Sequence, residues 1–132
     1  MKMRTFLVED NPTILENLAS TLEELAPVQT IGSADSVRSG ATWLVEHTAQ
    51  WDLAIIDLFL KDGSGLGILE ACQDRQEQQK IVVFSNYATR EMRIRCAQLG
   101  VDAVFDKSTE IDALVSYCSA QRKKLELEPQ LG

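Results

Sequence analysis

The chain has 132 residues, 45% of them hydrophobic and 25% charged, which predicts one globular domain with a single core. Its formal net charge of −7 argues against direct nucleic-acid binding, because that binding depends on a basic surface. No apolar stretch approaches the ~20 residues of a membrane-spanning helix, and the N-terminus lacks the apolar region of a secretion signal. We therefore expect a cytoplasmic protein without a nucleic-acid or membrane partner.

Apolar runs of strand length alternate along the chain with segments of helical periodicity. The predicted strands cover residues 5–8, 28–31, 53–56, 81–84 and 103–105, and Gly32 is expected to end the second. Capping residues and breakers place the helices at Asn11-Pro12 to Pro27, Ala34 to about His47, Ser64 to Cys72, Thr89 to Gly100, and from Ser108 or Thr109 onward. Five strands alternating with five helices predict a doubly wound (βα)5 sandwich of the α/β class with a parallel sheet.

Four of the predicted strands end in polar residues suited to phosphoryl chemistry. Glu9-Asp10 follow the first strand, Asp57 the third, Ser85 the fourth and Asp106-Lys107 the fifth. Because the carboxyl ends of parallel strands share one sheet edge, where ligands bind in open α/β folds, these side chains are expected to converge.

The expected convergence predicts a phospho-acceptor site. Close carboxylates repel one another unless a cation or a lysine neutralises them. Carboxylate and carbonyl oxygens suit Mg²⁺, and a carboxylate beside Mg²⁺ can attack a phosphoryl group to form an aspartyl phosphate. Ser85 can donate to a phosphoryl oxygen, and Lys107 can neutralise its charge. Each residue alone is compatible with an ordinary surface or capping role, but the combination at the ends of four strands favours a phospho-acceptor site.

These motifs resemble the receiver domains of response regulators in bacterial two-component signalling. The resemblance covers residues 4 to about 120. The matching segments are Leu7-Val8-Glu9-Asp10-Asn11-Pro12, Asp57-Leu58-Phe59-Leu60 with Gly65, Phe84-Ser85, and Ala103 to Lys107. It implies a sheet in the strand order 2-1-3-4-5, a receiver domain over residues 1–120, and a helix extension with a frayed tail over 121–132.

The resemblance also implies the roles of the acidic residues. Asp57 would be the phosphorylated residue. Asp10, Asp57 and the backbone carbonyl of Phe59 would bind Mg²⁺, with Glu9 acting mainly through bound water.

The remaining implied roles concern phosphotransfer and switching. Ser85 and Lys107 would contact the phosphoryl group, and Ser85 and Phe105 would be the switch residues, with Phe105 changing rotamer. The donor would be a histidine kinase or a histidine phosphotransfer protein, and the output would pass to another protein. The chain would then be a signalling switch that dephosphorylates itself slowly, and not an enzyme in the usual sense.

The chain departs from the family pattern at three positions. Lys61 stands where proline is usual, Asn86 where alanine is common, and Ser108 where a proline usually follows the lysine in a cis peptide. Because of these differences, the sequence does not predict the conformation of the loop after Asp57 or whether the Lys107-Ser108 peptide is cis or trans.

Other functional classes remain as alternatives. A haloacid-dehalogenase-type hydrolase would have a second aspartate where Phe59 stands, and a flavin-binding electron carrier would need a phosphate loop after the first strand. A pseudo-receiver that binds partners without phosphate is disfavoured because the acids and the lysine are present. Only about a dozen residues follow the fifth helix, which favours a stand-alone receiver over part of a longer regulator.

Overall fold

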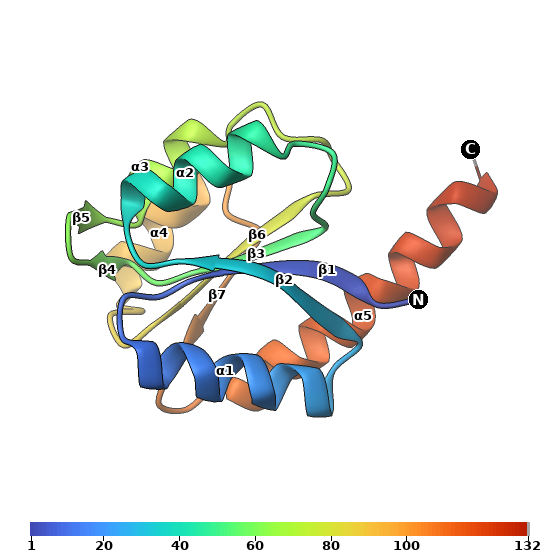
Figure 1. The fold of residues 1–132 in the computed structure, drawn as a ribbon, viewed down its shortest axis with the longest axis horizontal. Helices are drawn as coiled ribbons and strands as arrows, with labels where there is room; N and C mark the ends of the chain where they lie inside the picture. Colours follow the sequence, from blue (N-terminus) through green and yellow to red (C-terminus); the bar gives the residue numbers. More distant parts are fainter. Residues whose placement is uncertain (132) are drawn as a thin grey trace.

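A five-stranded parallel sheet lies between two layers of helices (Figure 1). The computed structural model describes residues 1–131, with side-chain environments up to residue 127. The strands of the sheet are β1 (Met3–Val8), β2 (Val28–Ala34), β3 (Leu53–Ile56), β6 (Lys80–Ser85) and β7 (Ala103–Asp106). Their order is β2-β1-β3-β6-β7. Since β6 and β7 are the fourth and fifth strands of this sheet along the chain, the predicted fold and the strand order 2-1-3-4-5 are confirmed.

Helices cover both faces of the sheet. They are α1 (Pro12–Leu25), α2 (Val37–Glu46), α3 (Leu66–Ala71), α4 (Arg90–Gln98) and α5 (Ile111–Leu131). Helices α1 and α5 lie on one face, and α2, α3 and α4 lie on the other (Figure 1). Along β1, Leu7 packs in the cluster with Leu22 of α1, whereas Phe6 packs in the cluster with Leu44 of α2. This alternation follows from the pleat, and it commits both faces of the sheet to the core.

Several predicted helix boundaries are confirmed. Asn11 Oδ1 accepts hydrogen bonds from the backbone N–H groups of Thr13 and Ile14 at 3.0 and 3.1 Å, with Pro12 at the first helical position. Thr89 caps α4, and Gly100, at φ 83°, follows its end.

The end predicted for the second strand is wrong. Strand β2 continues past Gly32 to Ala34, and the pairing of β1 with β2 shifts register between Thr5 and Phe6. A Cβ atom at Gly32 would lie 3.1 Å from Cε1 of Phe6. The glycine therefore makes room for the Phe6 ring instead of ending the strand. Helix α2 begins correspondingly later, with Ser36 as its N-cap.

A short antiparallel hairpin forms the segment after Asp57, whose conformation the sequence leaves open. Its strands are β4 (Phe59–Leu60) and β5 (Gly63–Ser64). The carboxylate of Asp62 at the turn accepts hydrogen bonds from the backbone N–H groups of Val37 and Arg38, at 2.7 and 3.1 Å. The hairpin is thereby attached to the start of α2.

Helix α5 begins at Ile111, later than a cap at Ser108 or Thr109 predicts. The hydroxyl of Ser108 donates instead to Asp106. The helix continues through residue 120, and Leu125 is buried in the core cluster that contains Met3. The proposed division at residue 120 stays a prediction. Of the tail predicted to fray, Gly132 and the side chains from residue 128 onward lie outside the described residues.

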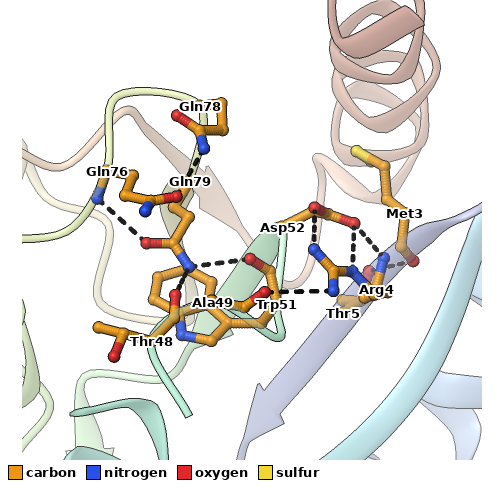
Figure 2. A network of polar contacts seen from close by, with 10 residues as sticks. All are labelled: Met3, Arg4, Thr5, Thr48, Ala49, Trp51, Asp52, Gln76, Gln78 and Gln79. Carbon is orange, nitrogen blue, oxygen red and sulfur yellow. Dashed lines mark hydrogen bonds and ion pairs between the residues drawn. The ribbon is translucent and has the colours of Figure 1, made fainter.

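A polar network closes the edge of the sheet where the strands begin (Figure 2). The Asp52 carboxylate accepts from the backbone N–H of Arg4 at 2.7 Å and from its guanidinium at 3.0 and 3.2 Å. The buried amide of Gln79 donates to the carbonyls of Thr48 and Trp51. These contacts hold the segment between α2 and β3. The acidic residues Glu9 and Asp57 lie at the opposite edge of the sheet, where the strands end.

Within the described residues the cysteines form no disulfide, and the helices do not have the character of membrane spans. Cys72, Cys96 and Cys118 are free and buried, and burial raises the pKa of each thiol. None of the helices in residues 1–131 combines the length and apolar character needed to cross a bilayer.

Candidate functional site

The predicted site residues lie where four neighbouring strands end at one edge of the sheet. Glu9 follows β1, Asp57 follows β3, Ser85 ends β6 and Lys107 follows β7. Backbone hydrogen bonds between adjacent strands continue to these positions. Asp57 N donates to Val8 O at 3.0 Å, and Lys107 N donates to Ser85 O at 3.1 Å. The rigid part of the fold therefore positions the side chains.

The ammonium group of Lys107 joins two buried carboxylates. It donates to Glu9 Oε1, and to Asp57 Oδ2 at 2.8 Å. The side chains of Lys107, Glu9 and Asp57 are only 11%, 3% and 10% exposed. Burial tends to lower the pKa of Lys107, but its hydrogen bonds with Asp57 and Glu9 outweigh burial and raise that pKa above its ordinary value. The lysine therefore stays charged and offsets part of the negative charge of the two carboxylates.

The other carboxylate oxygens accept from backbone groups. Glu9 Oε2 accepts from Asn11 N at 3.1 Å, so both oxygens of Glu9 have partners. Asp57 Oδ1 accepts only a longer hydrogen bond, from Phe59 N at 3.3 Å. Of the two buried carboxylates, Asp57 therefore has the oxygen that is held less firmly.

Asp10 stands apart from this cluster. It is exposed, and with Glu9, Asp35 and Trp43 it lines a hollow of about 510 Å³. Within residues 1–131, no three His, Cys, Asp or Glu side chains gather closely enough to hold a metal ion. The structure thus brings Glu9, Asp57 and Lys107 together, whereas Asp10 is not part of that contact. The donor types available from Asp10, Asp57 and the Phe59 carbonyl are all oxygen, which fits Mg²⁺.

Ser85 and Phe105 are packed inward. Ser85 is fully buried, and its Oγ accepts from the backbone N–H of Tyr87 at 3.2 Å. Among the described residues, that hydroxyl makes no hydrogen bond with Asp57 or Lys107. The Phe105 ring meets Tyr117 of α5 edge to face, with ring centroids 5.8 Å apart.

Gly65 has a steric role that the motif alone does not explain. A Cβ atom at this position would lie 2.2 Å from the backbone carbonyl oxygen of Asp57. The start of α3 therefore approaches the end of β3 too closely for any side chain. The Lys107-Ser108 peptide, left open by the sequence, is trans, because no cis bond occurs in residues 1–131.

The structure adds contacts that the sequence does not reveal. The rings of Phe59 and Tyr87 contact each other at a tilt of 38°, with centroids 3.9 Å apart. Arg93 of α4 forms an ion pair with Glu110 at 2.7 Å. No local pattern distinguishes Arg93 from Arg95, which makes no such contact among the described residues.

Comparison with known families decides what kind of domain carries this site. A sequence profile described as the response regulator receiver domain matches residues 5–119. The chain belongs to this family. Receiver domains of response regulators are generally regulatory and not enzymatic, and they receive phosphoryl groups from histidine kinases.

Named relatives are regulatory proteins. The receiver is 27% identical over 124 residues to the photosynthetic apparatus regulatory protein RegA of Rhodobacter capsulatus, covering 94% of this chain and 65% of RegA. It is 28% identical to the acid tolerance regulatory protein ActR of Rhizobium meliloti, covering 93% of this chain and 61% of ActR. The chain thus spans just under two thirds of these relatives.

Solved structures share the receiver fold. The signal receiver domain of a protein described as a Luxo repressor from Vibrio parahaemolyticus superposes with a TM-score of 0.80 at 21% identity, covering 99% of this chain and 98% of that one. CheY in a CheX–CheY–BeF3–Mg complex from Borrelia burgdorferi superposes with a TM-score of 0.74 at 13% identity, covering 87% and 88%. At these identities the likeness concerns the fold alone.

Proposed function

We propose that this receiver is a phosphorylation-dependent signalling switch that accepts a phosphoryl group on Asp57. The donor is a histidine kinase or a histidine phosphotransfer protein, and Mg²⁺ is required. The observation that carries the proposal is the contact of Asp57 with Lys107 at 2.8 Å, at the sheet edge that also holds Glu9 and Ser85. A nucleophile and a fixed positive charge are thereby adjacent, which suits phosphoryl transfer.

In the proposed reaction, a carboxylate oxygen of Asp57 forms a bond to phosphorus. The bond from phosphorus to the donor's imidazole nitrogen breaks and its electron pair stays on that nitrogen. A proton on the other nitrogen of the donor ring leaves the imidazole neutral. Lys107 holds positive charge beside the phosphoryl oxygens, and its raised pKa keeps it protonated throughout the neutral range. The buried surroundings of Asp57 strengthen this attraction because little water screens it.

Asp10, Asp57 and the backbone carbonyl of Phe59 would hold Mg²⁺, with Glu9 acting through bound water. When bound, the ion neutralises charge on the phosphoryl oxygens and orients them for transfer. The oxygen donor set supports this assignment. So does the magnesium and beryllium fluoride complex named for the structurally similar CheY.

After transfer, Ser85 would turn its hydroxyl from Tyr87 N toward the phosphoryl group. Phe105 would change rotamer as the neighbouring loop moves, and the surface near α4 and α5 would signal to a protein partner. The location proposed for this activity is the cytoplasm, with no direct binding of nucleic acid or membrane by this chain.

Incubation with acetyl phosphate and Mg²⁺, followed by intact mass measurement, tests the proposal. Wild-type protein should gain one phosphoryl group. Asp57→Asn should gain none while remaining folded, because the amide has a similar shape but is not a nucleophile. Asp35→Asn is the matched control, since Asp35 follows β2 at the same edge of the sheet, and it should still be labelled.

Three other outcomes would contradict the proposal in different ways. Normal labelling of Asp57→Asn would overturn the acceptor assignment. A wild-type protein that takes no phosphoryl group would be a pseudo-receiver. Rapid multiple-turnover release of phosphate would instead indicate a hydrolase.

A further inference from the structure

Arg93 of α4 connects the loops on either side of it. Its guanidinium donates from Nε to the carbonyl of Ala88 at 3.1 Å and from Nη1 to the carbonyl of Val104 at 3.0 Å. It also donates from Nη2 to Glu110 Oε1 at 2.7 Å, and the same oxygen accepts from Asp106 N at 3.0 Å. One ion pair thus holds the loop between β6 and α4, strand β7 and the loop between β7 and α5.

These loops carry the two residues proposed to contact the phosphoryl group. Ala88 lies three positions after Ser85, and the intervening Tyr87 donates its backbone N–H to Ser85 Oγ. Asp106 pairs with Ser85 across the sheet and directly precedes Lys107. The contacts of Arg93 are therefore made to residues close in sequence to both Ser85 and Lys107.

The pair is charged and accessible. The side chains of Arg93 and Glu110 are 41% and 35% exposed. The hydrogen bond from Arg93 is the largest cause that lowers the pKa of Glu110, so the pair is fully ionised at neutral pH. Because water can solvate both groups when they separate, the pair can open without unfolding the domain.

We propose that Arg93 and Glu110 form a clamp that favours the unphosphorylated arrangement of the loop between β6 and α4. This inference rests on the proposed function of Asp57. Turning Ser85 toward a phosphoryl group takes its hydroxyl from Tyr87 N and shifts the segment that ends at Ala88. The hydrogen bond from Arg93 to the Ala88 carbonyl opposes that shift. Linkage is reciprocal, so weakening the clamp favours phosphorylation.

The test compares Arg93→Gln, Glu110→Gln and the double variant with wild type. Each protein is titrated with acetyl phosphate at saturating Mg²⁺, and the phosphorylated fraction is read by intact mass. Arg93→Gln should lower the acetyl phosphate concentration needed for half labelling by about fivefold, because it removes the hydrogen bonds to the Ala88 and Val104 carbonyls. Glu110→Gln should have a smaller effect in the same direction. The double variant should match Arg93→Gln, because Arg93→Gln already abolishes the ion pair that Glu110→Gln removes.

The matched control is Arg95→Gln, which removes the same charge from an exposed position of α4. It should label as wild type does, which separates loss of the clamp from a general change in charge. Decay of the label after donor removal is measured for every protein, so that a longer lifetime is not mistaken for easier acceptance.

Hydrogen exchange of the unphosphorylated proteins gives an independent readout. The amides of Tyr87 and Asp106 should exchange faster in Arg93→Gln than in wild type or Arg95→Gln. If wild type is labelled but neither clamp variant needs less acetyl phosphate than wild type, the clamp is wrong and the proposed function still stands. A wild type that takes no phosphoryl group would overturn the proposed function, and the clamp's role with it. Glu110→Gln keeps the size of the side chain, so it still decides the matter if Arg93→Gln fails to fold.

Discussion

The Nζ atom of Lys107 lies 2.8 Å from Oδ2 of Asp57, and the same ammonium contacts Glu9. All three side chains are almost fully buried. Taking two carboxylates out of water is costly, and here one lysine offsets part of that cost through its contacts with both. The site is therefore sensitive to any change that removes the lysine and leaves its partners uncompensated.

Replacing the lysine should destabilise the metal-free protein. Lys107→Gln should lower the free energy of unfolding by about 3 kcal/mol at pH 7.5, as is typical when one partner of a buried ion pair is lost. The raised pKa of Lys107 means that its stabilising effect is complete below its ordinary value of 10.5 and disappears only as pH rises through the raised value. Urea unfolding with and without Mg²⁺ provides the measurement, and Mg²⁺ should restore part of the loss.

Lys61→Gln is the control for this prediction. Lys61 pairs with Asp35 at 2.7 Å, but the two side chains are 59% and 58% exposed. An exposed pair contributes little, so this variant should lose much less stability than Lys107→Gln. Equal losses for Lys107→Gln and Lys61→Gln would show that burial of the Lys107 contacts is not important.

The two acidic residues after β1 should differ in their effect on Mg²⁺. Both oxygens of Glu9 already have partners, whereas Asp10 is exposed on the adjoining hollow. Asp10→Asn should therefore weaken Mg²⁺ binding by about tenfold, equivalent to about 1.4 kcal/mol, and Glu9→Gln by clearly less. Trp43 lines the same hollow, so its fluorescence can follow a Mg²⁺ titration. Similar affinities for the two variants would contradict this assignment of ligands.

The sequence predicts the framework of the site better than its contacts. Alternating strands and helices fix a parallel sheet, and its carboxyl edge brings Glu9, Asp57 and Lys107 together. Adjacency in the sequence suggests that Asp10 joins them, but consecutive residues after a strand tend to point in opposite directions. Its placement depends on the course of the chain into α1. The pairing of Arg93 depends in the same way on how α4 packs beside β7.

The close approach at Gly65 predicts a further effect on the site. Gly65→Ala places a Cβ atom against the carbonyl oxygen of Asp57, so backbone must move. We expect a loss of about 1–3 kcal/mol in the free energy of unfolding and slower labelling by acetyl phosphate. Gly67→Ala is the matched control, since its Cβ atom would meet only the side chain of Val37. Normal labelling of Gly65→Ala would mean that the strand end tolerates displacement.

The contact between Phe59 and Tyr87 predicts a long lifetime for the phosphorylated state. Phe59 and Tyr87 follow Asp57 and Ser85 by two positions, and their rings lie 3.9 Å apart while remaining 51% and 52% exposed. Hydrolysis needs a water molecule in line with the bond from Asp57 to phosphorus. Neither ring has a carboxylate or amide to orient that water, and two rings in contact obstruct its approach.

Opening this pair should shorten the lifetime of the phosphorylated state. Phe59→Asn combined with Tyr87→Glu should speed loss of phosphate about tenfold, which corresponds to about 1.4 kcal/mol in the transition state. The measurement is decay of the intact-mass label after donor removal at saturating Mg²⁺. Ile94→Asn, at an exposed apolar position on α4, should decay like wild type. If the double variant decays no faster than wild type, then access of water past Phe59 and Tyr87 does not limit dephosphorylation.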